Sequence, residues 1–231
     1  MIKAVLFDID NTLLSFDEYV KESMKNGFEK FGIATYNDEM FAAFTQVNSK
    51  LWRLIEKGEM TFEELLKTRW NKIFEHLGIS ADGVAFEKYF RERLFDSAIP
   101  ENGAMDLLKY LHGKYILCVA SNGPYQQQKN RLKVGGMLPY FSDLFISEEI
   151  GSSKPAKSFF ATCFERLNSK LEQKIQPNEI IIIGDSLTSD MAGGIRFGMQ
   201  TCFYNPAKKE VPSDVKIDYT VTSLNEITNI L

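Results

Sequence analysis

The chain has few cysteines, little net charge and no long apolar run. Its three cysteines, Cys118, Cys163 and Cys202, are odd in number and far apart, which suits reduced thiols better than a disulfide framework or a zinc site. The formal net charge of −4 argues against a nucleic-acid polymer as partner, because such proteins usually carry a basic stripe. No apolar run approaches the about 20 residues of a membrane span, and Asp8 and Asp10 interrupt the N-terminal run too early for a signal peptide. We therefore expect a cytoplasmic protein that binds neither membranes nor nucleic acid.

The rest of the composition is that of an ordinary globular protein, with 44% hydrophobic and 25% charged residues among 231. Residues 1–14 and 99–231 alternate between short apolar runs and helical stretches, which predicts an α/β fold with a Rossmann-like, doubly wound parallel sheet. The predicted strands are Ile2–Phe7, Ile116–Ala120, Leu144–Ile146, Ile180–Ile183, Thr201–Tyr204 and Tyr219–Val221, and the clearest helices between them are Gly103–Leu111, Gln126–Val134 and Lys157–Leu171.

Residues 15–98 contain no convincing strand and predict an α-helical cap domain inserted into this core. Thr61 and Glu64 form a capping box that begins one helix, and Gly78 marks its end. An insertion directly after the first strand can act as a lid over the active edge of the sheet. Apolar residues recur at helical spacing in three stretches: Val20, Met24, Phe28 and Phe31; Phe44, Val47, Leu51 and Ile55; and Phe62, Leu65, Leu66, Ile73, Phe74 and Leu77.

The first strand delivers two carboxylates, Asp8 and Asp10, into the turn that follows it. Ligands bind at the carboxyl ends of the strands in an open parallel sheet. Two acids with no basic residue beside them in sequence need a cation, and Mg²⁺ bound through carboxylates and a substrate phosphate fits this requirement. One carboxylate could also attack phosphorus and form an aspartyl-phosphate.

Three further polar motifs follow the ends of later predicted strands. Ser121 and the Asn122-Gly123 pair offer a hydroxyl and backbone N–H groups to an anion. Lys154 precedes a proline, which keeps it extended so that its ammonium can be aimed. Asp185 and Asp190 follow the Ile180–Ile183 run. Each motif alone also fits a turn or a helix cap, but the ordered set at four strand ends favours a site for phosphate and metal.

This ordered set resembles the haloacid dehalogenase superfamily, whose motifs read here as DxDNTLL, SNG, KP and GDxxxxD. The resemblance implies that Asp8 is the nucleophile that takes the phosphoryl group and that Asp10 is the general acid and base. It implies Mg²⁺ held by Asp8, the backbone carbonyl of Asp10, and Asp185. Because the dehalogenase branch lacks an acid at the position of Asp10, the resemblance favours phosphoryl chemistry.

The same resemblance assigns the remaining motif residues. Ser121, Asn122, Gly123 and Lys154 would bind the phosphoryl group, and Ser121 and Lys154 would neutralise its developing charge. Asp190 would act from outside the metal's ligands or orient Lys154. The helical cap implies a small phosphomonoester as substrate, since a polymer would not fit beneath it, and the chain would act as a monomer or homodimer.

Two further sets of residues resemble the YjjG-type 5'-nucleotidase branch. One lies in the cap and comprises Asn48-Ser49-Lys50-Leu51-Trp52-Arg53, Glu56-Lys57-Gly58, Thr61 and Arg69; the other is Asn122-Gly123 followed by Gln128 and Arg131-Leu132. This resemblance implies nucleoside monophosphates as substrates, with pyrimidine and deoxy forms preferred. Asn48 and Trp52 share a helix face, so that Asn48 could hydrogen-bond a base and Trp52 could stack on it. The alternative is that Trp52 is a core residue and Asn48 its surface neighbour. Arg69 could reach the substrate or pair with Glu63 or Glu64 on the surface, and Trp70 is expected in the core.

Two other functions fit part of the pattern. A phosphatase or phosphomutase acting on a sugar phosphate or another small phosphorylated metabolite would use the same residues. A receiver-like switch would be phosphorylated on Asp8 without turnover, but the inserted helices argue against the open face that a receiver needs. A purely structural protein is disfavoured, because every catalytic position is filled.

Overall fold

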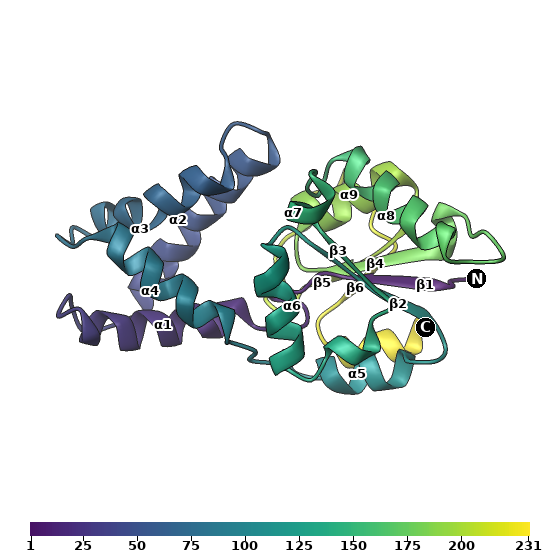
Figure 1. Cartoon of the computed structure of the whole chain (residues 1–231), viewed down its shortest axis with the longest axis horizontal. Coiled ribbons are helices and arrows are strands. Elements are labelled where there is room, and N and C mark those ends of the chain that lie inside the picture. The colour runs from purple at the N-terminus through teal and green to yellow at the C-terminus, as the bar shows by residue number, and fades with distance from the viewer. The chain divides into compact units, whose positions relative to one another are not determined.

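The computed structural model describes all residues from 1 to 231 and contains two compact units. The first unit comprises Met1–Ser15 and Ala98–Leu231, and the second comprises Phe16–Ser97. The chain therefore leaves the first unit after its first strand and returns to it 82 residues later. Each unit buries hydrophobic residues of its own, and Figure 1 shows the helices and strands of each unit.

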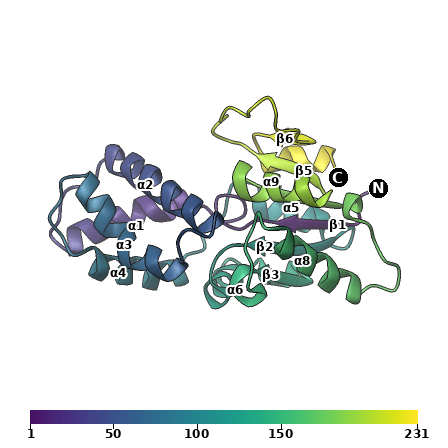
Figure 2. The ribbon, with the colours of Figure 1, turned by 90° about the horizontal axis from the view of Figure 1, so that it is seen from above.

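The first unit is built on a six-stranded sheet with the order β3-β2-β1-β4-β5-β6, and every neighbouring pair is parallel. Figure 2 shows the strands succeeding one another from β6 at one edge towards β3 at the other. The predicted doubly wound parallel sheet is confirmed, and the predicted strand ends differ from the observed ones by at most two residues. The strands are β1 (Ala4–Phe7), β2 (Ile116–Ser121), β3 (Asp143–Ile146), β4 (Ile180–Gly184), β5 (Gln200–Tyr204) and β6 (Tyr219–Val221).

Helices cover both faces of this sheet, with α5 and α6 on one side and α8 and α9 on the other (Figure 1). Successive strand residues alternate between the two interiors, because side chains of a strand point to opposite faces. In β4, Ile181 and Ile183 pack towards α5 while Ile180 and Ile182 pack towards α8. The helices and helical turns are α5 (Ala104–Leu111), α6 (Tyr125–Val134), η1 (Leu138–Tyr140), α7 (Ser147–Ile150), α8 (Lys157–Ser169), η2 (Pro177–Glu179), η3 (Leu187–Met191), α9 (Ala192–Phe197) and η4 (Leu224–Asn229).

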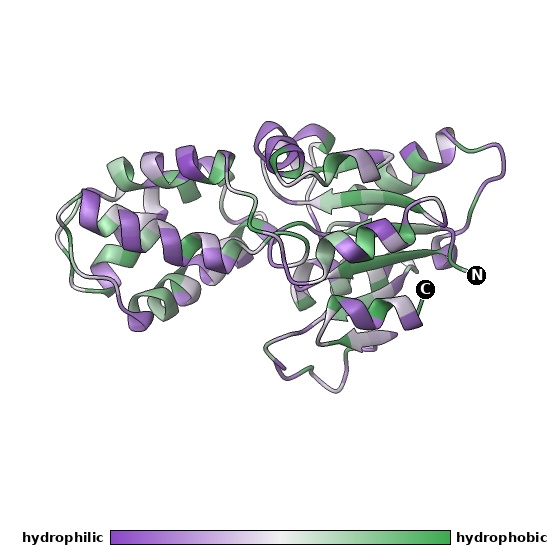
Figure 3. Cartoon of the chain, turned by 90° about the horizontal axis from the view of Figure 1, so that it is seen from below, coloured by the Kyte–Doolittle hydropathy of each residue, from purple (hydrophilic) through white to green (hydrophobic).

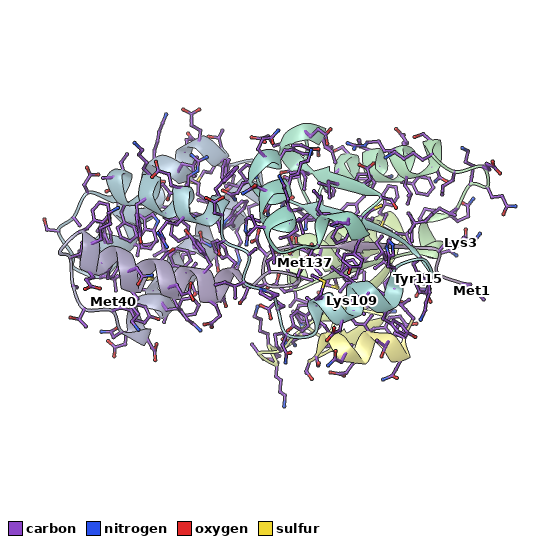
Figure 4. The ribbon with its side chains drawn as sticks, turned by 60° about the horizontal axis from the view of Figure 1, so that its bottom comes forward. Met1, Lys3, Met40, Lys109, Tyr115 and Met137 are labelled. Carbon is purple, nitrogen blue, oxygen red and sulfur yellow. The ribbon has the colours of Figure 1, made fainter.

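Near the amino ends of the strands, side chains tie neighbouring segments of the chain together. The Lys3 ammonium lies 2.8 Å from a Glu179 carboxylate oxygen, and the Tyr115 hydroxyl donates a hydrogen bond to the carbonyl of Leu231. Figure 4 shows Lys3 and Tyr115 at the same end of the unit as Met1. The carboxyl ends of the strands lie at the opposite end, where the predicted site residues follow β1, β2 and β4.

The second unit contains four helices packed around aromatic rings. Figure 3 shows their ribbons alternating between hydrophobic and hydrophilic residues, as expected for helices that bury one face. Trp70, predicted as a core residue, is 1% exposed and contacts several phenylalanine rings. The Thr61–Glu64 capping box is present as predicted, but a fourth helix was not resolved from the sequence. The helices are α1 (Phe16–Lys30), α2 (Asp38–Glu56), α3 (Phe62–His76) and α4 (Gly83–Phe95).

Arg69 lies inside this helical unit, so one of the two alternatives for it, a surface pair with Glu63 or Glu64, is wrong. The Arg69 guanidinium binds the carboxylate of Glu87 on α4 through two hydrogen bonds of 2.6 and 3.0 Å, and both residues are under 5% exposed. A third hydrogen bond of 3.2 Å runs from Arg69 to the side-chain oxygen of Asn48 on α2. Since a buried charge requires a charged partner, this pair ties together three of the four helices.

None of the helices is both long and apolar enough to cross a membrane.

The buried Arg69–Glu87 pair predicts a strong effect of Glu87 on the stability of the helical unit. Glu87→Ala leaves the Arg69 guanidinium buried without its carboxylate, so we expect the free energy of unfolding to fall by about 3–5 kcal/mol. Denaturant unfolding followed by tryptophan fluorescence measures this unit specifically, because both tryptophans of the chain, Trp52 and Trp70, lie in it.

Glu63→Ala is the matched control, because it removes an exposed ion pair, 2.7 Å long, with Lys67 in the same unit. Exposed pairs contribute little to stability. Equal losses in the two variants would contradict a structural role for the Arg69–Glu87 pair.

Candidate active site

The carboxyl ends of β1 and β4 form the topological switch point of the sheet. From β1 the chain proceeds outward through β2 and β3, and it then crosses to the other side of β1 to form β4. Ligands bind in open α/β sheets in the crevice where the strand order reverses in this way. Asp8 follows β1 and Asp185 follows β4, and the backbone N–H of Asp8 donates to the carbonyl of Ile183 across a distance of 2.9 Å. The register therefore places both acids at the switch point.

A tight turn after β1 fixes the position of Asp10. The carbonyl of Ile9 accepts hydrogen bonds from the N–H groups of the next residues, including Leu13 and Leu14 at 2.9 Å. Asn11 has a φ of 57°, a left-handed conformation that asparagine tolerates better than most residues. Leu13 and Leu14 are fully buried in the core between the sheet and α5. The DNTLL part of the motif is therefore the anchor of the turn.

Lys154 is the cationic centre of the site, and only 1% of it is exposed. Its ammonium donates to Asp8 Oδ1 at 2.6 Å, to Asp190 Oδ1 at 2.7 Å and to the backbone carbonyl of Ala120 at 2.6 Å. An ammonium has three protons, so all of its donors are used. Burial alone would lower the pKa of Lys154, but Asp190 and Asp8 outweigh it and hold the pKa above its usual range.

Burial has the opposite effect on the nearby carboxyl of Asp8. It raises the pKa of Asp8 to about 7, although the Lys154 ammonium opposes the rise and Asp190 adds to it. Desolvation disfavours the charged form of a carboxyl group. An additional positive charge at this position would therefore favour the ionised form of Asp8.

Asp190 is held in place by the loop that follows β4. Its second oxygen, Oδ2, accepts a hydrogen bond of 3.1 Å from the backbone N–H of Ser186. A Cβ added to Gly184 would lie only 2.2 Å from the same oxygen, so the close approach of Asp190 requires glycine at this position. Asp190 thus connects the end of β4 with Lys154.

Three acidic side chains could hold a metal ion here, because oxygen atoms of Asp8, Asp185 and Asp190 lie within 4.8 Å of one another. Three carboxylates and the Lys154 ammonium sum to a charge of −2 when ionised, which matches one divalent cation. Carboxylate oxygens are the ligands of Mg²⁺ in proteins. The Asp190 side chain is only 1% exposed and both of its oxygens accept hydrogen bonds, whereas the side chains of Asp8 and Asp185 are 12% and 21% exposed. Asp8 and Asp185 are therefore better suited to direct coordination. The residues therefore fit a Mg²⁺ site.

The side chain of Asp10 does not belong to this acidic group. Its Oδ1 accepts a 2.6 Å hydrogen bond from Arg131, and its Oδ2 accepts a 2.8 Å hydrogen bond from Gln128 Nε2. Both donors lie on α6 and are at most 1% exposed, whereas 36% of the Asp10 side chain is exposed. The predicted metal contact of Asp10 involves its backbone carbonyl only, and it stays a prediction.

The loop after β2 lies beside these groups. Ser121 is 1% exposed, and its hydroxyl oxygen accepts hydrogen bonds from Gln128 Nε2 at 2.9 Å and from the Gly123 N–H at 3.2 Å. Asn122 makes a reciprocal pair with the backbone of Lys154, donating to its carbonyl at 2.9 Å and accepting from its N–H at 2.8 Å. Asn122 therefore joins the Ser121 loop to the Lys154 loop, and both polar atoms of its side chain form hydrogen bonds within the protein.

Sequence reasoning did not anticipate the contact of Gln128 and Arg131 with Asp10. The two residues are three apart on one face of α6, and that face is buried. Both residues belong to the resemblance to YjjG-type nucleotidases that the sequence shows after Asn122-Gly123, but their contact with Asp10 depends on which way the helix faces, and that is set by its packing. The other two residues predicted to bind substrate, Asn48 and Trp52, lie on α2 of the helical unit and are partly buried.

Comparison with known proteins gives matches along nearly the whole chain. HAD-hydrolase YfnB of Bacillus subtilis is 34% identical over 229 residues, covering 99% of this chain and 95% of YfnB. Pyrimidine 5'-nucleotidase PynA of Streptococcus pneumoniae is 31% identical, covering 99% and 94%, and pyrimidine 5'-nucleotidase YjjG of Escherichia coli is 30% identical, covering 98% and 96%.

A solved structure and a family model agree with these relatives. The crystal structure of YfnB bound to magnesium matches with a TM-score of 0.89 at 35% identity, and the match covers 100% of this chain and 98% of that one. A family model described as haloacid dehalogenase-like hydrolase matches residues 2–198. The chain thus belongs to the haloacid dehalogenase-like hydrolases and is an enzyme of that family.

Proposed function

We propose that this enzyme is a Mg²⁺-dependent phosphomonoesterase that hydrolyses nucleoside 5'-monophosphates, with pyrimidine and deoxy forms preferred. The observation that carries the chemistry is the buried group of Asp8, Lys154 and Asp190 beside Asp185, with the carboxylate of Asp10 close by in the same turn. The substrate class is supported by PynA and YjjG, which are named pyrimidine 5'-nucleotidases and match this chain over almost its full length.

In the first step a carboxylate oxygen of Asp8 attacks phosphorus, and the bond between phosphorus and the ester oxygen breaks. Asp10 gives a proton to the departing oxygen, so that the nucleoside leaves as an alcohol. The product of this step is an aspartyl-phosphate on Asp8. The partial exposure of the Asp10 side chain allows it to reach a substrate, whereas the more deeply buried Asp190 is held by Lys154 and Ser186.

In the second step Asp10, now ionised, takes a proton from water, and the water oxygen attacks the phosphorus of the aspartyl-phosphate. The bond between phosphorus and the Asp8 oxygen breaks, which releases inorganic phosphate and restores the Asp8 carboxylate. The two steps use Asp10 in opposite protonation states. The hydrogen bonds from Arg131 and Gln128 hold its carboxyl group in one place for both.

Mg²⁺ would be held by Asp8, Asp185 and the backbone carbonyl of Asp10, and it would offset the repulsion between the Asp8 carboxylate and the substrate phosphate. Lys154 contributes a fixed positive charge. Because its three protons are already used, it can donate to a phosphoryl oxygen only by releasing a present partner. Asp8 is the partner whose charge falls when it takes the phosphoryl group, so this contact is the one that would be exchanged.

The phosphoryl oxygens would also be bound by donors of the loop after β2. Ser121 offers its hydroxyl, and the turn at Asn122 and Gly123 offers backbone N–H groups. This assignment places the side chain of Asn122 in a supporting role, since it is paired with the backbone of Lys154.

The helical unit would supply recognition of the base through Asn48 and Trp52. Arg69 can only donate hydrogen bonds, so its contact with Asn48 Oδ1 fixes the amide orientation and leaves the amide NH₂ of Asn48 as a donor. The carbonyl oxygens of a pyrimidine are suitable acceptors for that donor. Trp52 packs against Phe62 with ring centroids 5.9 Å apart, and its partly exposed indole would stack on the base.

The proposed chemistry predicts that turnover needs both Mg²⁺ and Asp8. We expect phosphate release from UMP, dUMP and dTMP with Mg²⁺, and none with excess chelator or in the Asp8→Asn variant, because the nucleophile or its charge compensation is then missing. A malachite-green assay of released phosphate measures this, with AMP, glucose phosphates and a small aryl phosphate in the same panel. Turnover of glucose phosphates alone would refute the nucleotide assignment, and undiminished turnover by Asp8→Asn would refute the mechanism.

The orientation of the Asn48 amide predicts a selective effect on nucleotides. Asn48→Asp keeps an oxygen for Arg69 but replaces the NH₂ donor with an acceptor. We expect the KM for UMP to rise about three- to tenfold, the effect of one hydrogen bond, with kcat/KM for a small aryl phosphate unchanged. Equal changes for both substrates would show that Asn48 does not contact the base.

A further inference from the structure

A chain of four buried or partly buried polar side chains runs from α6 into the active site. It consists of Arg131, Gln128, Ser121 and Asp10, and its three hydrogen bonds around Gln128 measure 2.8, 2.8 and 2.9 Å. Gln128 is 0% exposed and Arg131 is 1% exposed. Buried polar groups of this kind have a defined hydrogen-bond direction, because each donor must meet an acceptor.

The direction of this chain is set by Arg131. A guanidinium has only donors, so the atom of Gln128 that faces it at 2.8 Å must be the carbonyl oxygen Oε1. The NH₂ group of Gln128 is thereby turned to the other side. Its two protons go to Asp10 Oδ2 at 2.8 Å and to Ser121 Oγ at 2.9 Å. The orientation of the Gln128 amide therefore follows from a neighbour that cannot accept a hydrogen bond.

This orientation of the Gln128 amide determines how the Ser121 hydroxyl can form hydrogen bonds. A serine hydroxyl has two lone pairs and one proton. Gln128 Nε2 occupies one lone pair, and the backbone N–H of Gly123 at 3.2 Å occupies the other. With both lone pairs used, the hydroxyl group can interact with a further ligand only as a donor. A phosphoryl oxygen, which is an acceptor, requires such a donor.

We propose that Gln128 and Arg131 are positioning residues that commit the Ser121 hydroxyl to donating a hydrogen bond to the phosphoryl group and that hold the Asp10 carboxyl in the same network. The inference rests on the proposed function, which supplies the phosphoryl group. It adds two residues to that function, and neither Gln128 nor Arg131 touches the substrate in this scheme. They act through Ser121 and Asp10.

The surroundings of Gly123 are a second observation, because the Gln128 side chain fills the space that a larger residue at this position would need. A Cβ added to Gly123 would lie 2.6 Å from Gln128 Nε2 and 2.8 Å from two other atoms of the same side chain. A side chain at position 123 would therefore displace the Gln128 amide from both of its acceptors. The position of the Gln128 side chain therefore favours glycine at the end of the Ser121–Gly123 motif.

Two substitutions at Gln128 separate polarity from packing. Gln128→Glu keeps the size of the side chain and an oxygen for Arg131, but it removes the donor to Asp10 and presents an acceptor to Ser121. Ser121 then donates its proton to this oxygen and not to the phosphoryl group. Gln128→Met removes the hydrogen bonds yet leaves the Ser121 hydroxyl free to rotate towards a ligand. The probe is inorganic phosphate, titrated into the Mg²⁺-loaded full chain by calorimetry, with folding of each variant checked by thermal unfolding.

We expect phosphate affinity to fall at least about tenfold in Gln128→Glu and less in Gln128→Met, although Gln128→Met loses more hydrogen bonds to its neighbours. A purely structural role would give the reverse order, with Gln128→Met the weaker binder. That reverse order, or unchanged affinity in both variants, would overturn the inference.

The Ser121→Ala background separates the effect on Ser121 from simple repulsion of phosphate by the new carboxylate. Repulsion acts with or without the hydroxyl, whereas the proposed effect needs it, so Gln128→Glu should weaken phosphate binding much less in Ser121→Ala. The same fold-change in both backgrounds would contradict the inference.

The two proposals fail in different ways. A wild type that shows the expected binding pattern but releases phosphate from no phosphomonoester would refute the proposed function and support this inference. A wild type that releases phosphate from nucleotides but binds no inorganic phosphate would overturn this inference and leave the proposed function standing.

Discussion

The arrangement of the active site depends on one buried positive charge, the ammonium of Lys154. It joins Asp8 after β1, the carbonyl of Ala120 in β2 and Asp190 after β4, so three strands converge on a single nitrogen. Three carboxylates so close together would repel one another strongly in a medium of low dielectric constant. The ammonium makes their approach possible, and the negative charge that remains on the group is what the proposed divalent cation would offset. The two loops that carry Ser121 and Lys154 are in turn locked by Asn122.

The strands and the acids that follow them could be predicted from the sequence for a simple physical reason. A run such as Ile180–Ile183, apolar at every position, fits only a strand covered on both faces, and the end of such a strand in a parallel sheet is where polar side chains can collect. The helical character of residues 15–98 followed from the period of their apolar residues. The Thr61–Glu64 capping box is a local arrangement and was therefore visible in four residues.

The contacts that sequence could not provide join residues far apart in the chain. Arg69 and Glu87 meet in the interior of the helical unit, whereas charged helical residues are usually at the surface, and nothing near either residue reveals the partner. Gln128 and Arg131 lie 118 and 121 positions from Asp10. Their contact depends on the rotation of α6 against the sheet, which is set by packing of residues such as Leu132 rather than by local pattern.

The division of the sheet unit into two stretches of chain affects the order in which the protein can form during synthesis. β1 leaves the ribosome first, but its partners β2 and β4 begin more than 110 and 170 residues later. The helical unit is continuous in sequence and complete by Ser97, so its contacts can close while β1 still has no neighbour. The strand that carries Asp8 therefore stays an unpaired apolar segment until β2 has been synthesised. An early-folding insert brings its two ends, Phe16 and Ser97, into fixed positions, and it thereby shortens the effective loop that β1 must close to meet β2.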